Sequence, residues 1–256
     1  MLTFLPGPVR GALSLFLFAI NTVFWTLPLL FLHLVKLSIP AKGWRRYWSR
    51  FQNGIGTVWI SFNNWNLWLT NPVRWDVQGL DRLSKDRWYL VTANHQTWVD
   101  ILVLQKVFNG RIPFLKFFLK KELFWVPFLG LAWWSLDYPF LKRSAAAGKD
   151  LETILEASEK FKTVPVSVMN FVEGTRFTPE KREKQRSPHS HLLKPKAGGL
   201  AFILDAMRGE FDSILDVSIA YPQGAPSFWD FLCGSARDIR IHVEVIPIED
   251  RILGSS

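Results

Sequence analysis

Two apolar patterns of helical length occupy the first part of the chain. Residues 11–32 carry no charged side chain and only four polar ones. As an α-helix this run is about 33 Å long, enough to cross the hydrocarbon core of a bilayer. Pro28 is expected to bend or break the helix near its C-terminal third. The run is longer than the apolar part of a cleaved signal peptide, so a membrane-embedded helix is favoured.

The second pattern is an apolar stripe with spacings of three and four residues, which predicts an amphipathic helix with aromatic anchors. Its members are Trp44, Trp48, Phe51, Ile55, Trp59, Phe62, Trp65 and Leu69. Such a stripe ordinarily packs on a soluble core, but the preceding apolar run and nearby cations favour a membrane. We predict that residues 5–70 form a membrane-embedded helical hairpin, either one span with a surface helix or both helices in one leaflet.

From Val73 onward, short apolar strand patterns alternate with helical ones. The predicted strands are residues 88–92, 112–118, 164–172, 214–221 and 239–246, and the predicted helices are residues 98–108, 123–132, 145–161 and 198–207. This alternation predicts an α/β fold with a mostly parallel central sheet flanked by helices. The polar, basic residues 178–196 are expected to form a loop. The predicted domains are a membrane-anchoring hairpin over residues 1–72 and an α/β domain over residues 73–256.

The charge distribution favours membrane lipids as partners. The chain has 31 Lys and Arg against 22 Asp and Glu, a net charge of +9, yet no acidic residue precedes Asp76. The early cations flank apolar stretches, which suits anionic headgroups and offers no surface that reads nucleic acid. Cations after the first apolar run place the following domain on the cytoplasmic face, and a bacterial inner membrane is favoured. The 13 Trp residues suit a bilayer interface.

The first candidate for chemistry directly follows the predicted strand 88–92. The sequence there is Asn94-His95-Gln96-Thr97-Trp98-Val99-Asp100. A histidine at the carboxyl end of a strand faces the ligand crevice of an α/β sheet. Asp100 can fold back over the first helical turn and hold one imidazole nitrogen, leaving the other to act as a base. The alternative is a capping box, in which Asp100 only satisfies backbone N–H groups.

Two further blocks contain cations near predicted strand ends. Glu173-Gly174-Thr175-Arg176 ends the strand 164–172; its glycine permits a tight turn and its arginine can grip an anion. The alternative is an ordinary surface turn. The other block holds Lys120-Lys121-Glu122-Leu123, Pro127, Gly130 and Phe140-Leu141-Lys142-Arg143, which suits a phosphate-headed lipid or a solvated face.

In this order, the blocks resemble the glycerolipid acyltransferase family that includes 1-acyl-sn-glycerol-3-phosphate acyltransferases. The family pattern is N-H-x4-D, then K-x-E-L-x3-P-x2-G leading to F-[IVL]-x-R, then E-G-T-R, then a late apolar segment that residues 214–222 resemble. Two positions depart from it. Asp137-Tyr138-Pro139 stands where many members have a glycine, and Asp216 stands where the last block usually has proline.

The resemblance implies transfer of an acyl group from acyl-CoA or acyl carrier protein to the hydroxyl of 1-acyl-sn-glycerol-3-phosphate, giving phosphatidic acid. His95 would be the general base and Asp100 would orient it, with no covalent acyl-enzyme. The implied substrate-binding residues are Lys121, Arg143, Glu173, Gly174, Thr175 and Arg176, of which all but Lys121 would hold the glycerol phosphate. No metal or other cofactor is expected. One Cys excludes a Cys-based zinc cage, and His189-x-His191 lacks further ligands.

Three alternatives stay open: another lysophospholipid acceptor, a lipid or thioester hydrolase, and a membrane-surface binding protein. A hydrolase of this kind requires a nucleophile, but the sequence contains no G-x-S-x-G motif. Cys233 is expected to be a small buried residue. A binding protein leaves two polar blocks at strand ends unexplained. Residues 112–136 are rich in Phe and Trp and are expected to line an acyl groove and touch the headgroup layer, although these rings alternatively only fill the core.

Overall fold

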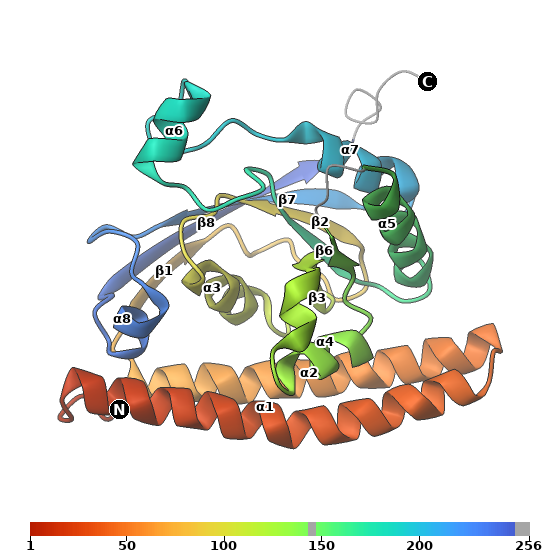
Figure 1. Ribbon diagram of the computed structural model, residues 1–256, viewed down its shortest axis with the longest axis horizontal. Helices are drawn as coiled ribbons and strands as arrows, with labels where there is room; N and C mark the ends of the chain where they lie inside the picture. Colours follow the sequence, from red (N-terminus) through yellow and green to blue (C-terminus); the bar gives the residue numbers. More distant parts are fainter. Residues whose placement is uncertain (143–146, 249–256) are drawn as a thin grey trace.

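A twisted six-stranded sheet separates two layers of helices in the computed structural model, which describes residues 1–142 and 147–248 (Figure 1). The strand order is β1-β8-β7-β2-β6-β3. Strands β7, β2, β6 and β3 are parallel, β8 is antiparallel to β7, and β1 is parallel to β8. The predicted α/β fold with a mostly parallel sheet is therefore confirmed. The strands are β1 (Arg74–Gln78), β2 (Tyr89–Ala93), β3 (Leu115–Phe117), β6 (Ser167–Phe171), β7 (Ser213–Ala220) and β8 (Asp238–Pro247).

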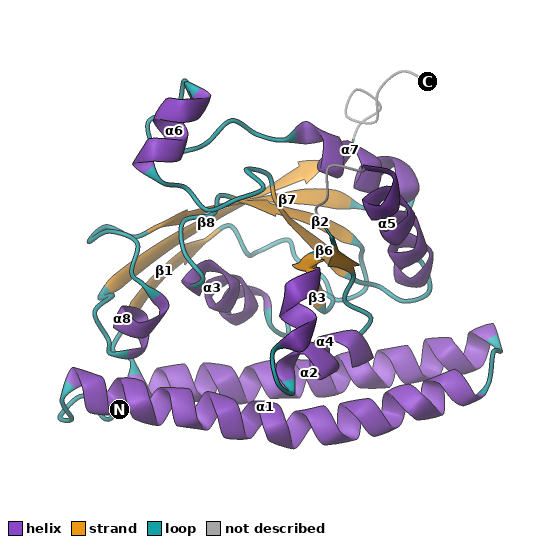
Figure 2. Cartoon of the chain, in the orientation of Figure 1, coloured by secondary structure: helices purple, strands orange, loops and turns teal. Residues whose placement is uncertain are grey.

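A small second sheet pairs β4 (Leu119–Lys120) with β5 (Phe140–Leu141). Helices α3, α4 and α8 lie between the main sheet and the long pair α1 and α2, whereas α5, α6 and α7 lie across the sheet from that pair (Figures 1 and 2). The helices are α1 (Gly7–Ser38), α2 (Lys42–Thr70), α3 (Val99–Phe108), the 3₁₀ helix η1 (Lys121–Trp125), α4 (Leu129–Ser135), α5 (Ala147–Phe161), α6 (Pro179–Gln185), α7 (Ala197–Ala206) and α8 (Phe228–Leu232).

The predicted helix 123–132 is wrong as a single element, because the chain turns between η1 and α4. Phe128 has a positive φ of 60°, and Pro127 precedes it. Gly130 lets α4 fold back on η1: a Cβ there would lie only 1.9 Å from the carbonyl oxygen of Phe124. Local turn chemistry thus overrides the apolar periodicity. Strands β1, β4 and β5 and helix α8 were not predicted, and the segment 178–196, predicted as a loop, contains the helix α6.

The predicted helical hairpin is present as α1 and α2, which run side by side beneath the domain (Figure 1). Pro28 does not break α1, which is continuous over 32 residues. The two helices hold each other through buried polar side chains. The amide of Asn21 donates to Asn63 Oδ1 at 2.8 Å, and the Asn66 amide donates to the Ser14 carbonyl oxygen at 2.9 Å. The Gln52 amide reaches the Leu29 carbonyl at 3.3 Å.

The side of the helix pair that faces away from the α/β domain is apolar and uncovered. Its large side chains are 50–65 % exposed, while the amide side chains of Gln52, Asn63 and Asn66 are buried, which inverts the usual polarity of helices on a soluble protein. We call this surface the outer face, defined by Phe16, Phe24, Phe31, Phe51, Phe62, Trp65 and Trp68. Of the predicted stripe on α2, Phe51, Phe62 and Trp65 are exposed, Trp59 is buried, and the other four residues are partly buried. By length and composition, α1 is the one helix in the described residues able to cross a bilayer.

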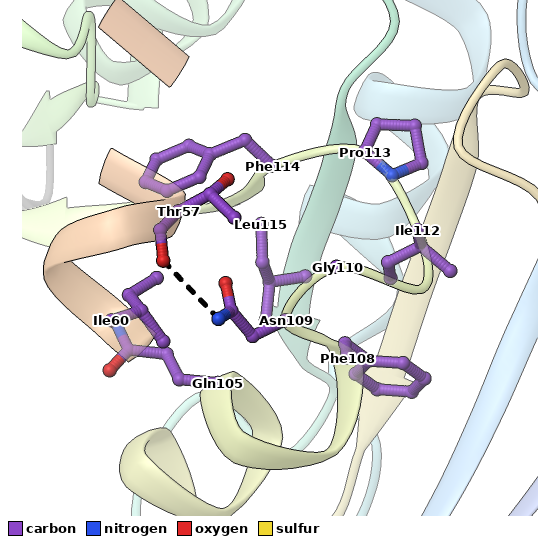
Figure 3. A pocket seen from close by; sticks show the side chains of 10 residues that line it. All are labelled: Thr57, Ile60, Gln105, Phe108, Asn109, Gly110, Ile112, Pro113, Phe114 and Leu115. Carbon is purple, nitrogen blue, oxygen red and sulfur yellow. Dashed lines mark hydrogen bonds between the residues drawn. The ribbon is translucent and has the colours of Figure 1, made fainter. Parts of the chain in front are cut away.

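The helix pair and the α/β domain share one hydrophobic core. Leu29, Trp59, Ile60 and Leu67 belong to the same buried cluster as the side chains of α3 and the sheet. Figure 3 shows the fit of α2 against the end of α3, where the Asn109 amide donates to the Thr57 carbonyl at 3.2 Å. The space left there is about 10 Å³, which holds at most one water molecule. This contact is therefore packing and offers no ligand site.

A buried cluster of charges fastens the end of α1 to the domain. The ammonium of Lys36 pairs with the Asp137 carboxylate at 2.7 Å, and Lys116 donates to the adjacent Leu136 carbonyl. Burial lowers the pKa of Lys116 to about 8. Burial alone would raise the pKa of Asp137, but the ammonium groups of Lys116 and Lys36 outweigh it and lower that pKa. Asp137, one of the two departures from the family pattern, thus neutralises two buried cations.

Asp137→Asn is predicted to destabilise the fold by about 3 kcal/mol, because it leaves buried ammonium groups without a counterion. Asparagine tolerates the positive φ of 58° at this position, so the backbone need not change. Thermal unfolding at neutral pH measures the loss. Since a lowered carboxyl pKa stabilises only above that pKa, the difference from the wild type should shrink in acid. Glu159→Gln, which breaks an exposed pair with Lys162, is the control and should change little.

Candidate active site

Three neighbouring parallel strands end at one edge of the sheet, and each delivers a polar residue there. His95 follows β2, Glu173 follows β6, and Tyr221 follows β7. The carboxyl edge of such a sheet is where α/β proteins bind ligands, because the loops there leave a crevice. The N-H-x4-D block and the E-G-T-R block are therefore brought together by the pairing of β2 with β6.

His95 and Asp100 form a hydrogen-bonded pair at this edge. His95 Nδ1 lies 2.8 Å from Asp100 Oδ2, and since an ionised carboxylate only accepts, Nδ1 carries the proton. Within the described residues no hydrogen bond engages Nε2, which is the nitrogen left to act as a base. The imidazole stacks on Phe171 with ring centroids 3.8 Å apart, so its plane is held. His95 is 14 % exposed and can meet a substrate, whereas Asp100 is fully buried.

The carboxylate of Asp100 also accepts hydrogen bonds from backbone N–H groups, as the capping-box alternative predicts. Its Oδ2 accepts from the backbone N–H of Gln96 at 2.6 Å and of Thr97 at 2.9 Å. These bonds bend the chain between β2 and α3 so that His95 comes back over Asp100. The two interpretations left open by the sequence therefore describe one arrangement, in which the loop fold and the imidazole contact depend on the same oxygen.

Tyr221 is a site residue that sequence reasoning missed. Its hydroxyl donates to the remaining oxygen of Asp100, Oδ1, at 2.6 Å, and its ring is buried. Burial first, and then the charge of Asp100, raise the pKa of Tyr221, so the hydroxyl keeps its proton. In the sequence, Tyr221 is the last residue of the predicted strand 214–221 and lies in the late segment 214–222 of the family pattern, but no local pattern marks it as a partner of Asp100. Tyr221, Asp100 and His95 form a chain of hydrogen bonds that ends at Nε2.

The asparagine that precedes His95 ties β2 to its neighbour. Asn94 donates to the carbonyl of Ile219 at 2.9 Å and accepts from the N–H of the same residue at 2.8 Å. The Gln96 amide donates to that carbonyl as well, at 2.8 Å. The loop that carries His95 is thus fixed to β7 on one side by side-chain bonds that no local pattern predicts.

Glu173 braces the other side of the loop. Its carboxylate is buried and accepts from the His95 N–H and the Leu193 N–H, both at 2.8 Å. A carboxylate repels phosphate, so the geometry gives Glu173 a positioning role between two chain segments. It does not place the carboxylate as a direct phosphate ligand.

The rest of the E-G-T-R block turns toward the histidine. Gly174 has a φ of 68°, which favours glycine, and closes a tight turn after β6. The N–H of Phe177 donates to the His95 carbonyl at 2.7 Å, so the chain from Thr175 to Phe177 runs beside the histidine loop. The Cζ atom of Arg176 lies 5.2 Å from the centroid of the Trp98 ring. The side chain is exposed, which leaves its N–H donors available to an anion.

Lys121 lies apart from this group. It lines a cleft of about 490 Å³ with Lys142 and the rings of Phe124, Trp125 and Phe140. Neither His95 nor residues 173–176 line that cleft. The aromatic residues of the 112–136 segment divide between two environments, because Phe114 and Phe117 are buried in the core while Trp125 is 78 % exposed. Arg143, also predicted to bind substrate, lies outside the described residues.

No metal centre emerges from the described part of the chain, where no group of three or more His, Cys, Asp or Glu side chains is placed to hold an ion. His189 and His191 are both exposed. Cys233 is half-buried against the start of α1, where its carbonyl accepts from Arg10 at 2.8 Å. The thiol therefore lies in a packing contact between α8 and α1.

The sequence pattern of the family named Acyltransferase matches residues 74–221, which include the histidine loop, the E-G-T-R block and Tyr221. The chain belongs to this family. The predicted resemblance is thus confirmed. Asp216, the second departure from the family pattern, lies in β7 and accepts a hydrogen bond from Thr92 of β2 at 2.8 Å, so it links two central strands.

Several relatives carry the name 1-acyl-sn-glycerol-3-phosphate acyltransferase. The chain is 28 % identical over 185 residues to 1-acyl-sn-glycerol-3-phosphate acyltransferase 3 of Arabidopsis thaliana. The alignment covers 66 % of this chain and 48 % of that one. It is 32 % identical over 179 residues to the alpha protein of Bos taurus, covering 68 % and 54 %. The chain spans about half the length of the curated relatives it matches.

A solved structure shares the fold. The crystal structure of the 1-acyl-sn-glycerophosphate (LPA) acyltransferase PlsC from Thermotoga maritima aligns with a TM-score of 0.56 at 21 % identity. The alignment covers 98 % of this chain and 90 % of that one. The helix pair is therefore included in the shared architecture along with the α/β domain.

Tyr221→Phe is predicted to lower kcat about tenfold, because it removes one charge-assisted hydrogen bond from Asp100. The phenyl ring still fills the buried space. With one donor fewer, the negative charge of Asp100 acts more strongly on His95, and the acid limb of the pH–rate profile should move to higher pH.

Tyr138→Phe is the matched control for this prediction. Its hydroxyl is also buried and donates to the Leu115 carbonyl at 2.7 Å, away from the histidine. This variant should lose stability without a shift in the pH profile. Equal pH profiles for Tyr221→Phe and the wild type would show that Tyr221 only supports the fold.

Proposed function

We propose that this protein transfers a fatty acyl group from a thioester donor to the hydroxyl of a lysophospholipid, with 1-acyl-sn-glycerol-3-phosphate as the acceptor. The observation that carries the proposal is the His95–Asp100 pair, held at 2.8 Å beside an exposed Arg176 at one sheet edge. A base can take the proton of the acceptor hydroxyl, and a neighbouring guanidinium can hold the phosphate of the same molecule. The names of the relatives support the choice of acceptor.

The reaction balances with one base. Nε2 of His95 accepts the proton of the acceptor hydroxyl as the oxygen attacks the thioester carbonyl. The carbon–sulfur bond then breaks, and the histidine returns the proton to the departing thiolate. Asp100 stabilises the imidazolium between these two steps through its bond to Nδ1. Because a thioester is already activated, a positioned base and aligned substrates are sufficient.

The geometry disfavours a hydrolase with a covalent intermediate. Such an enzyme needs a hydroxyl or thiol nucleophile bonded to Nε2. Within the described residues, the side chain of His95 bonds to Asp100, and the nearby hydroxyl of Thr97 is engaged with the Pro226 carbonyl at 2.7 Å. A donor of either kind, acyl-CoA or acyl carrier protein, fits this mechanism.

The test uses the purified full chain with lysophosphatidate and labelled acyl-CoA or acyl carrier protein. Labelled phosphatidate is the expected product, and His95→Ala should lower its rate about 10²- to 10⁴-fold while leaving thermal unfolding cooperative. A panel of other lysophospholipids checks the acceptor. Release of free fatty acid instead would indicate a hydrolase, and no turnover with any pair would favour a binding protein.

We also propose that the outer face lies within one leaflet of the cytoplasmic membrane and that residues 73–256 stand on it. Near its start, Arg10 of α1 reaches the carbonyl after α8, and near its end Lys36 pairs with Asp137. A helix attached at both ends to the domain cannot turn away to cross the bilayer. Residues 1–72 would then anchor the domain beside its lipid substrate.

Changing Phe31, Phe62 and Trp65 together to Ser should weaken binding to anionic vesicles about tenfold or more, because three apolar side chains leave the bilayer. These residues are exposed, so the fold should persist, whereas Trp59 is buried and unsuitable for this test. Phe202→Ser is the control, since Phe202 is also exposed but lies on α7, across the sheet. Vesicle sedimentation measures the effect. Unchanged binding would remove the outer face from membrane docking.

A further inference from the structure

The segment after β6 carries a large excess of positive charge. Between Gly174 and Lys196 there are seven Lys and Arg residues and only two carboxylates, those of Glu180 and Glu183. No ion pair among the described residues involves any of these nine side chains. Figure 1 shows α6 across the sheet from α1 and α2, so a bilayer on the outer face does not cover these cations.

Lys181 directs its charge back to the E-G-T-R turn. Its ammonium donates to Thr175 Oγ1 at 3.0 Å and to the Arg176 carbonyl at 2.9 Å. The next residue, Phe177, is bonded to the His95 carbonyl. The Lys181 ammonium is therefore bonded to the residue directly before Phe177, whose N–H holds the histidine loop. An ammonium has three donors, so one remains for a ligand.

Lys196 approaches the same turn from the other side. Its N–H donates to the Val172 carbonyl at 2.7 Å, which draws the chain alongside the end of β6. A Cβ built on Gly174 would lie 3.1 Å from Lys196 Cδ and 3.8 Å from its ammonium nitrogen. The absence of a side chain at Gly174 thus leaves space for the lysine to lie across the turn.

We infer that Lys181 and Lys196 join Arg176 in binding a phosphate group of the substrate at the turn formed by Gly174 and Thr175. This inference rests on the proposed function and adds two binding residues that the family blocks do not contain. Three cations without carboxylate partners on one turn stabilise a dianionic phosphomonoester better than a single guanidinium does.

The phosphate is assigned to the acceptor because of where the turn lies. In 1-acyl-sn-glycerol-3-phosphate, the reacting hydroxyl and the phosphate ester are on neighbouring carbons. A phosphate held at this turn therefore leaves the hydroxyl close to the His95 loop, to which the turn is directly hydrogen-bonded. The phosphates of a coenzyme A donor are separated from its thioester by the long pantetheine arm.

The experiment compares Lys181→Gln and Lys196→Gln in the full chain with Lys184→Gln. Lys184 is exposed on α6, has no role in the site, and serves as the matched control. Each site variant should raise the acceptor KM about three- to tenfold, the loss of one charge-assisted bond, with kcat and the donor KM unchanged. Lys181→Arg keeps the charge and should recover most of the affinity.

Other outcomes overturn the inference in distinguishable ways. A rise in the donor KM would assign these cations to the donor phosphates, and unchanged constants would make them a solvated surface. A lower unfolding temperature with unchanged acceptor KM would make Lys181 a structural link only.

Calorimetric titration with glycerol 3-phosphate, which needs no turnover, keeps this test separate from the proposed reaction. Weaker binding by both site variants, with the Lys184→Gln value at wild type, supports the site even if lysophosphatidate is not the acceptor. Equal binding by all variants, or none by the wild type, refutes it even if acyl transfer is observed.

Discussion

The buried carboxylate of Asp100 joins the loop after β2 to the end of β7, where Tyr221 lies 121 residues further along the chain. One oxygen folds the loop after β2 and receives His95, while the other receives the hydroxyl of Tyr221 from the end of β7. A buried carboxylate is costly without donors, and here four hydrogen bonds satisfy it. The position of the His95 imidazole therefore depends on the same bonds that make this charge tolerable, which couples the candidate site to the fold of the sheet edge.

The inverted polarity of α1 and α2 follows from a different constraint. Polar side chains such as Asn63 and Asn66 are buried because they bond to the partner helix, while aromatic side chains remain uncovered. In water this arrangement exposes a large apolar surface, whereas the hydrogen bonds between the helices keep these amides away from that surface. Lys36 and Asp137 fix the pair to the domain, so the apolar surface and the sheet edge have one defined relation.

The positive segment after β6 begins beside the loop that Asp100 folds, because the Phe177 N–H donates to the His95 carbonyl. Under the proposed function, a lipid acceptor presents its headgroup to a base on this loop, and the cations on the neighbouring turn would orient it. Glu173 contributes by bracing, since its carboxylate bonds to backbone on both sides of the turn. Glu173, which braces the backbone, and Arg176, which we propose binds phosphate, thus come from the same short block.

The sequence alone determined the fold class, the apolar helices and the His95–Asp100 pair, because these depend on periodicity and short spacing, which local patterns record. Tertiary structure alone decided the partners of Asp100 beyond its own loop, since Tyr221 meets it only when β7 pairs beside β2. It also decided that Glu173 braces backbone, that α4 separates from η1, and that the amides of Asn63 and Asn66 on α2 are buried. These features arise from contacts between segments distant in the chain, for which a local pattern carries no signal.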